Sequence, residues 1–282
     1  MNTSHVKFAV IIPIYNRPEY LYSSIESVCR QIYSPEQVII VDDSSDHGYI
    51  ADFAAIISGF RDRLPISYMR LESNVGPACA RNRAFEILNP SVTHISFLDS
   101  DDVWHPCKLQ AVARIYAHFN CDIVLHKYTS CSVTFSQELT LLHDDSCNSA
   151  RRIHSLNALL SNPCQTSCFS MTRSSILPFP LGQRYCEDYC LILSALALGR
   201  SVFKIDSSLT FLGRAQHSAG GLSSNIIKMR IGEIRAYWQF ASHTSSLYSF
   251  PLLVFLSFSK ALLLFFRLSV MRVLAWLPRS IS

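Results

Sequence analysis

Charged residues are scarce in this 282-residue chain, making up 16% of it against 49% hydrophobic residues. So small a share of charge argues against an intrinsically disordered protein and fits a chain that buries a sizeable core. There is no dense run of lysine and arginine before the C-terminus, and the net charge is only +4. Nucleic-acid binding is therefore poorly supported, whereas a mildly basic protein suits anionic nucleotides or anionic lipid.

Glycine-rich phosphate loops are missing as well. Residues 13–18 follow the first predicted strand without any glycine, and no GxGxxG pattern occurs there. This absence counts against a dinucleotide-binding enzyme. It also disfavours a nucleotidyltransferase, an enzyme class that likewise combines a parallel sheet with a nucleotide and an aspartate-bound metal.

The ten cysteines include no CxxC pair, the spacing that a structural zinc site usually shows. Cys164 with Cys168 and Cys186 with Cys190 have CxxxC spacing, which on a helix puts both sulfurs on one face. We favour buried thiols over zinc ligands. Because the apolar run of residues 7–14 is too short for a signal peptide, we expect reduced thiols in a cytosolic compartment.

Apolar runs typical of buried strands alternate along the chain with amphipathic helical segments. This alternation predicts an α/β fold with a mostly parallel sheet. Residues 128–180 are less regular, and we expect short strands, turns and one helix there. The predicted strands cover residues 7–14, 37–41, 66–71, 94–98, 121–127, 201–206 and 208–213, and the predicted helices cover 18–31, 48–60, 77–88, 106–119, 155–160, 187–198 and 226–242.

Polar clusters follow three of these strands, at residues 13–17, 42–46 and 99–102. Parallel sheets bind their ligands at the carboxyl ends of the strands, so the coincidence indicates a ligand site. The last cluster could hold a divalent cation through carboxylate oxygens, and that cation could bridge a diphosphate. The ordinary alternative is helix capping by Asp101 or Asp102.

The other polar segments suit a nucleotide in the same way. An aspartate in the 42–46 cluster could accept the N–H of a nucleobase, unless Ser45 or Asp46 simply caps a helix. Tyr15 could stack on the base or be purely structural. The segment 74–82 opens a helix with small residues, which favours an anion at its N-terminus.

A third group of residues suggests proton transfer. Glu187 and Asp188 begin a predicted helix, where a carboxylate in a cleft could take a proton from a hydroxyl, or merely stabilise the helix dipole. His217 lies in a polar loop and could complete a metal's coordination, although a lone histidine is more often a surface residue.

The C-terminal segment from residue 247 to 277 is unusually apolar but is interrupted by Lys260, Arg267 and Arg272, with Arg279 after it. On a helix these four cations fall within roughly 140° of arc. We therefore expect an amphipathic helix on a membrane surface rather than a membrane-spanning one. Packing on the catalytic domain or in a dimer is the alternative.

Taken in order, IIPIYNR, VDDSSD, NVGPACARN, FLDSDD and CEDY, followed by a loop with a histidine, resemble the family 2 glycosyltransferases of the GT-A fold. Each piece is unspecific, but the ordered set is specific and covers roughly residues 7–220. The resemblance is closest to enzymes of bacterial surface polysaccharides. It implies a catalytic domain over residues 1–245, followed by the amphipathic segment 246–282.

The resemblance also implies roles for individual residues. Pro13, Tyr15 and Asn16 would line the base pocket, Asp43 would contact the base with Asp42 beside it, Arg81 would approach the nucleotide, and Asp99 would meet the ribose or sugar. Asp101 would bind a divalent metal, Mn²⁺ or Mg²⁺, with His217 as a further ligand. Asp188 would be the catalytic base, with Glu187 positioning acceptor or donor. Trp104 would shape the acceptor side.

The expected activity is inverting transfer of a sugar from a nucleotide-diphosphate sugar, most often a UDP-sugar in this family, to a hydroxyl of a glycan or lipid-linked acceptor. We expect a hexosyltransferase-type enzyme at the inner face of the plasma membrane, held there by the C-terminal segment. The alternative is a catalytically degenerate nucleotide-sugar-binding protein. The intact set of Asp43, Asp99, Asp101 and Asp188 argues against it.

Overall fold

A computed structural model provides the structure of the chain. It describes residues 3, 5–129, 149–213, 225–244, 251, 253–255 and 258–259. The predicted alternation of strands and helices is confirmed over these residues. Most boundaries fall within two residues of those expected, because each apolar run ends at a proline, a polar cluster or a glycine.

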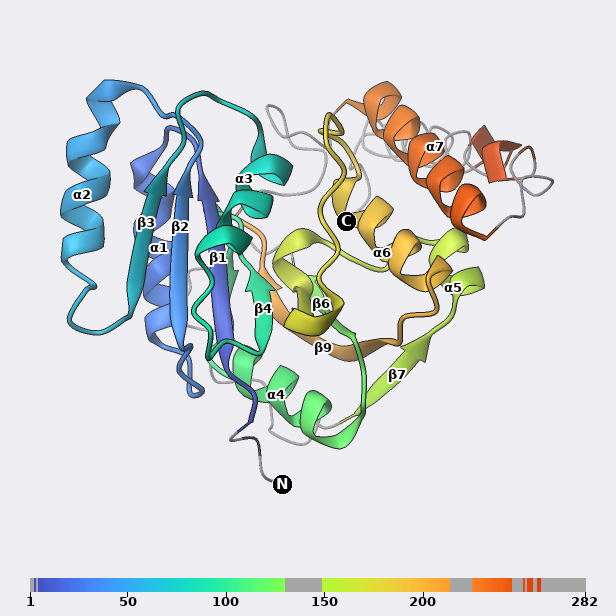
Figure 1. The fold of residues 1–282 in the computed structure, drawn as a ribbon, viewed down its shortest axis with the longest axis horizontal. Helices are drawn as coiled ribbons and strands as arrows, with labels where there is room; N and C mark the ends of the chain where they lie inside the picture. The colour runs from blue at the N-terminus through green and yellow to red at the C-terminus, as the bar shows by residue number, and fades with distance from the viewer. Residues whose placement is uncertain are drawn as a thin grey trace, which may run out of the picture.

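Four parallel strands, in the order β3-β2-β1-β4, form one half of a nine-stranded sheet (Figure 1). Every residue of β1 and β2 is buried, which explains why both strands are continuously apolar rather than alternating. These strands and the helices that follow them are β1 (Phe8–Ile14), α1 (Pro18–Cys29), β2 (Gln37–Asp42), α2 (Ile50–Ser58), β3 (Ile66–Arg70), α3 (Pro77–Ala84) and β4 (His94–Phe97).

The other half of the sheet is mixed. β8 runs antiparallel between β4 and β6, and β9 pairs with β6, β5 and β7. The two strands predicted at 201–206 and 208–213 are one strand, whose pairing with β6 shifts register on both sides of Lys127. The elements are β5 (Val103–Trp104), α4 (Lys108–His118), β6 (Ile123–Thr129), β7 (Ala150–Ile153), β8 (Phe169–Thr172) and β9 (Val202–Phe211).

Two hydrophobic cores cover the two faces of the sheet. Alternate residues of β1 point to opposite faces, so Phe8, Val10 and Ile12 join α1, α2 and α4, while Ala9 and Ile11 join α3, α6 and α7. The remaining helices, α5 (Ser155–Leu160), α6 (Glu187–Ala197) and α7 (Ile226–His243), gather on the side of the molecule opposite α2 (Figure 1).

The strand order reverses at β1, because β2 and β3 extend the sheet to one side of it and β4 to the other. The carboxyl ends of β1, β2 and β4 therefore meet at a topological switch point, where open α/β sheets bind ligands. The three polar clusters of the sequence lie at this point. The fold thus brings together residues that are up to about ninety positions apart.

The segment 246–282, which we expect to bind membranes, lies almost wholly outside the described residues. Of those that are described, Leu253 is buried against the core, whereas Phe255 and Phe258 are 69% and 61% exposed. Across the described part of the chain, no helix is both long and apolar enough to cross a bilayer. The division at residue 245 remains a prediction.

Candidate active site

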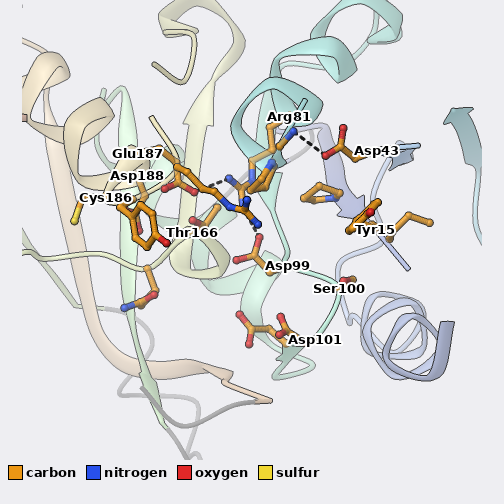
Figure 2. Close-up of a pocket in the computed structure, with 18 of the residues that line it drawn as sticks. Tyr15, Asp43, Arg81, Asp99, Ser100, Asp101, Thr166, Cys186, Glu187 and Asp188 are labelled. Carbon is orange, nitrogen blue, oxygen red and sulfur yellow. Dashed lines mark hydrogen bonds and ion pairs between the residues drawn. The ribbon is translucent and has the colours of Figure 1, made fainter. Parts of the chain in front are cut away.

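A cleft of about 680 Å³ opens at the switch point. One wall comes from the ends of β1 and β2 and carries Tyr15 and Asp43, and the opposite wall comes from the start of α6 with Glu187 and Asp188 (Figure 2). Its lining includes nearly all the predicted site residues that the structure describes: Pro13, Tyr15, Asn16, Asp43, Arg81, Asp99, Asp101, Glu187 and Asp188.

The backbone around this cleft is strained at several positions. Asn16, Arg17, Ser44 and Cys186 all have positive φ angles, between 48° and 72°. Three of these four residues line the cleft. A left-handed conformation costs energy in residues other than glycine, and such strain concentrates where side chains must be aimed at a ligand. Cys186 is notable because its turn starts α6 and so places Glu187 and Asp188.

The Asp42–Asp43 pair divides into a buried and a cleft-facing residue. Asp42 is fully buried and accepts hydrogen bonds from Tyr68 (2.8 Å), Arg70 (2.7 Å) and the backbone N–H of Ser45 (2.8 Å). It lies beside Asp43, as expected, but it does not line the cleft, so its place among the nucleotide-binding residues is corrected to a positioning role. Asp43 instead lines the cleft, as expected for a residue that contacts the nucleobase.

Asp43 lies on the cleft wall formed by the ends of β1 and β2. Its two carboxylate oxygens accept the backbone N–H groups of Val75 and Gly76, each at 2.8 Å, and so fix the loop before α3. Burial raises the pKa of Asp43, and these two hydrogen bonds oppose the increase. Gly76 has φ +86°, a conformation that favours glycine. Tyr15, which is 48% exposed, also lines the cleft.

Arg81 connects two acidic residues of the cleft, Asp99 and Glu187. Its guanidinium is nearly inaccessible and forms ion pairs with Asp99 at 2.5 Å and Glu187 at 3.2 Å (Figure 2). It also lies 5.1 Å from the ring centroid of Phe179. Through its two Nη atoms, Arg81 orients two carboxylates of the cleft. Arg81 also lines the cleft, and its expected approach to the nucleotide remains a prediction.

Asp188 differs from Glu187 beside it. Glu187 is buried and paired with Arg81, whereas Asp188 is partly exposed on the cleft wall and accepts only the N–H of Tyr189, at 2.7 Å, among the hydrogen bonds seen. Desolvation, followed by the negative charge of Glu187, raises the pKa of Asp188 to about 7. A carboxylate with this pKa is suited to accept a proton near neutral pH.

The FLDSDD turn separates its aspartates by role. Asp102 is buried, accepts from Ser167 Oγ at 2.5 Å and from the N–H of Gly213 at 3.1 Å, and has a pKa raised mainly by desolvation. It therefore fixes the turn. Asp101 lies on the cleft and offers hard oxygen atoms, as Mg²⁺ and Mn²⁺ prefer.

The described residues fit a metal held in part by the substrate. Over the described ranges, no group of three or more histidine, cysteine or acidic residues is arranged to bind an ion. Mg²⁺, however, commonly binds through one or two carboxylates together with substrate phosphates, and Asp101 can supply the first of these. The predicted ligand His217 lies outside the described residues, so its role remains a prediction.

The capping alternatives do not apply to these aspartates. α4 begins at Lys108, with Cys107 as its N-cap, and Asp46 precedes a short helix without any side-chain capping bond. Trp104, expected near the acceptor, is instead fully buried and donates its indole N–H to Ser167 O at 2.8 Å. That expectation is wrong because the turn after Asp102 enters the sheet as β5.

The cysteine pairs are not helical pairs. Cys164 precedes the strand region of β8, and Cys186 is the N-cap of α6 rather than part of the helix. All the described cysteines are free thiols, and Cys121, Cys164, Cys168, Cys186 and Cys190 are buried. Burial raises the pKa of each of these five thiols.

Several residues of the cleft escaped the sequence analysis. Arg184 and Arg230 line it; Arg230 is paired with Glu233 of the same lining, so Arg184 is the residue that adds net positive charge. Gln183 donates its side-chain amide to the carbonyl groups of Tyr185 and Cys186, at 3.0 and 3.2 Å, and so holds the turn before the acidic pair. No local pattern distinguishes Gln183 and Arg184 in their irregular loop, or Arg230 on α7, from ordinary surface residues, so only the folded chain reveals them.

A comparison with known families matches residues 9–178 to the family described as Glycosyl transferase family 2. The amylovoran biosynthesis glycosyltransferase AmsB of Erwinia amylovora is 35% identical over 37% of this chain and 34% of its own length. The putative teichuronic acid biosynthesis glycosyltransferase TuaG of Bacillus subtilis is 34% identical over 40% of this chain and 43% of its own. The chain therefore spans less than half the length of these curated relatives.

Solved structures share the fold. S. aureus TarS 1-349 in complex with UDP-GlcNAc superposes with a TM-score of 0.62 at 22% identity, over 84% of this chain and 67% of that one. The mannosyltransferase PcManGT from Pyrobaculum calidifontis, in complex with GDP-Man and Mn²⁺, gives 0.63 at 14% identity, over 95% and 80%. Since the family match covers more than half of the sequence, this chain belongs to glycosyl transferase family 2 and has the GT-A fold.

Proposed function

We propose that this protein transfers a sugar, with inversion, from a nucleotide-diphosphate sugar to a hydroxyl group of a glycan or lipid-linked acceptor. One observation carries the proposal. Asp188 is a partly exposed carboxylate on the cleft wall, and its pKa is raised to about 7 by desolvation and by Glu187. A group of this kind can deprotonate an acceptor hydroxyl as that hydroxyl attacks the anomeric carbon.

The nucleoside would occupy the wall formed by β1 and β2. Tyr15 would stack on the base and Asp43 would accept its N–H, with Pro13 and Asn16 completing the pocket. Asp99, which Arg81 holds at 2.5 Å, would meet the ribose or the sugar. A UDP-sugar is the donor that we favour, in keeping with the UDP-GlcNAc complex of the structural neighbour.

The diphosphate would lie between these walls, where Arg184 adds positive charge. Asp101, with His217 as a further candidate, would hold a divalent cation, which when bound stabilises the negative charge of a departing diphosphate. During transfer, the bond from the acceptor oxygen to the anomeric carbon forms as the bond to the diphosphate oxygen breaks. The acceptor's proton moves to the carboxylate of Asp188.

The biological setting that we propose is cell-surface polysaccharide synthesis. The relatives named for amylovoran and teichuronic acid biosynthesis support it. We propose further that residues 1–245 form the catalytic domain. The segment 246–282 would then hold the protein peripherally at the inner face of the membrane, close to lipid-linked acceptors.

A panel of nucleotides tests the donor side. Thermal unfolding of the full chain would be followed with UDP, GDP, dTDP or CMP, each with Mn²⁺ or with a chelator. Ligands that bind only the native state raise its stability by about 2.7 kcal/mol at a hundredfold excess over Kd. We expect a metal-dependent increase in melting temperature with UDP, and release of UDP from a UDP-sugar once an acceptor is added.

The control is Asp101→Asn, which should lose the metal dependence of the nucleotide effect. A folded protein that responds to no nucleotide would contradict the proposal. A protein that binds a nucleotide but turns over no sugar donor, with any glycan or lipid-linked acceptor, would favour the degenerate binding protein.

A further inference from the structure

α7 has two faces of different character. Its inner face packs against α6 and the core through Gly232, Glu233, Ala236, Tyr237, Phe240 and Ala241. On the outer face, Ile227, Ile231 and Trp238 are 74%, 47% and 54% exposed. At 100° per residue these three side chains lie within roughly 40° of arc, so they form one continuous outer stripe. Single exposed apolar residues are ordinary, but a stripe of them marks an interaction surface.

The charges beside the outer stripe all have one sign. Lys228 and Arg235 are exposed and flank it on one side. The acidic residue of α7, Glu233, is buried on the inner face, where it bonds to Arg230 and to the hydroxyl of Tyr237. Along Ile226–His243, which the structure describes in full, the outer face therefore carries cations and no carboxylate.

The same helix forms part of the cleft. Met229, Arg230 and Glu233 of α7 line it. A methyl group built on Gly232 would come within 2.4 Å of the carbonyl oxygen of Tyr185, so α7 touches the turn before Glu187 backbone to backbone. Figure 1 shows α7 on the outside of the molecule with α6 beside it. A partner bound to the outer stripe would therefore lie across α7 from the cleft, about one helix width (roughly 10 Å) away.

We propose that the outer stripe of α7, Ile227, Ile231 and Trp238 flanked by Lys228 and Arg235, binds the surface of an anionic phospholipid bilayer. Isoleucine side chains can enter the acyl boundary, tryptophan prefers the interface, and the cations meet lipid phosphates. This contact is separate from the one expected of residues 246–282. If the proposed function is correct, it also sets the cleft beside lipid-linked acceptors.

The charges favour lipid over a second copy of the chain. In a symmetric dimer the outer stripe would face itself, and Lys228 and Arg235 would approach their own copies. Like charges brought together in this way oppose association, and the outer face supplies no carboxylate to compensate. An anionic bilayer satisfies the cations and the apolar side chains at once.

Trp238 provides a direct test. In full-length protein carrying Trp276→Phe, the remaining tryptophans are Trp238 and the fully buried Trp104. We expect vesicles of phosphatidylglycerol and phosphatidylcholine to shift the emission to shorter wavelength. Lipids brominated on their acyl chains should quench this emission. Vesicles of pure phosphatidylcholine should cause a much smaller shift. Protein that binds the vesicles without any change in Trp238 emission or quenching would overturn the proposal.

Substitutions measured by vesicle flotation give a second test. Arg235→Glu should weaken binding to anionic vesicles at least fivefold, since one cation near such a surface contributes about that factor. Ile227→Glu combined with Ile231→Glu should do the same. Arg61→Glu and Ile32→Glu, exposed positions beyond α2 and α1, are the matched controls and should leave binding unchanged.

Equal binding by the α7 variants and their controls would also overturn the proposal. The proposal would also fail if Trp238 emitted at short wavelength in buffer alone and brominated lipid did not quench it. The outer stripe would then be covered by residues 245–282 or by a second copy. No substrate enters either test. The nucleotide panel decides the proposed function separately, so failure of one can be told from failure of the other.

Discussion

Two pairs of adjacent acidic residues, Asp42–Asp43 at the end of β2 and Glu187–Asp188 at the start of α6, have sharply different surroundings. In the first pair, Asp42 and Asp43 are supplied with donors: Asp42 bonds to Tyr68, Arg70 and Ser45, and Asp43 to two backbone N–H groups. In the second pair, Arg81 reaches only Glu187, and Asp188 remains desolvated beside a like charge. A carboxylate that is well supplied with donors fixes geometry, whereas one that lacks them can take up a proton.

Asp188→Asn should have the largest effect, because it removes the proton acceptor and little else. We expect transfer to fall by about 10² to 10⁴-fold, the usual contribution of a general base, while nucleotide binding stays near that of the native protein. Steady-state kinetics and the nucleotide panel measure the two quantities. Substantial residual transfer would remove Asp188 from the role; Asp206→Asn, on an exposed residue of β9, is the control.

Arg81→Gln should have the next largest effect, which is a loss of stability. It leaves Glu187 buried without its cation, and breaking a buried ion pair in this way typically costs about 3–5 kcal/mol. Urea unfolding measures the loss. Arg83→Gln breaks the exposed Arg83–Glu86 pair on the same helix and should cost less than about 1 kcal/mol. Similar losses of unfolding free energy in the two variants would show that the ion pairs of Arg81 contribute no more than an exposed pair.

The first pair can be separated by substituting each member. Asp42→Asn should lower the free energy of unfolding by about 1–3 kcal/mol, since buried partners lose a charged acceptor, with little change in nucleotide affinity at a temperature where the protein is folded. Asp43→Asn should weaken nucleotide binding as well. If Asp42→Asn alone weakened binding in folded protein, the division between a positioning and a contacting aspartate would be wrong.

The pH dependence sharpens the second pair. Asp188 must be deprotonated to act, so kcat/KM should fall as the pH falls below about 7. The stability of the folded protein has the opposite pH dependence. The folded pKa lies above the unfolded value, so the folded protein gains stability from protonated Asp188 at low pH and loses it as the pH rises through about 7.

Asp188→Asn should therefore raise the melting temperature at pH 8, by about 2–4 °C for each kcal/mol of relief, and much less at pH 5. Calorimetry at the two pH values decides it. An equal change in melting temperature at pH 8 and pH 5 would show that the negative charge of Asp188 does not destabilise the native state.

The sequence predicts the parallel half of the molecule well, because its buried strands are continuous apolar runs and each ends at a polar cluster. It predicts the mixed half poorly. β5, β7 and β8 have only two to four residues, too few for a periodic pattern, and β9 was divided because a register shift in its pairing interrupts the alternation.

The site shows the same limit. Motif order placed Tyr15, Asp43, Asp99, Asp101 and Asp188 around a single cleft. It could not show that Asp42 and Trp104 turn inward, because Asp42 is the last residue of β2 and Trp104 belongs to the two-residue strand β5, and the motifs do not fix where either strand ends. Nor could it show that Arg81 joins two carboxylates, one of which lies more than a hundred positions away along the chain.

The five buried thiols have a practical consequence for the lifetime of the protein. With their pKa values raised by burial, they are poor nucleophiles in the native state and should resist oxidants and alkylating reagents. Cys164, Cys186 and Cys190 belong to one core, so a single large opening would present several thiols together. Disulfides formed then would block refolding, and stored enzyme would lose activity at the rate at which it opens.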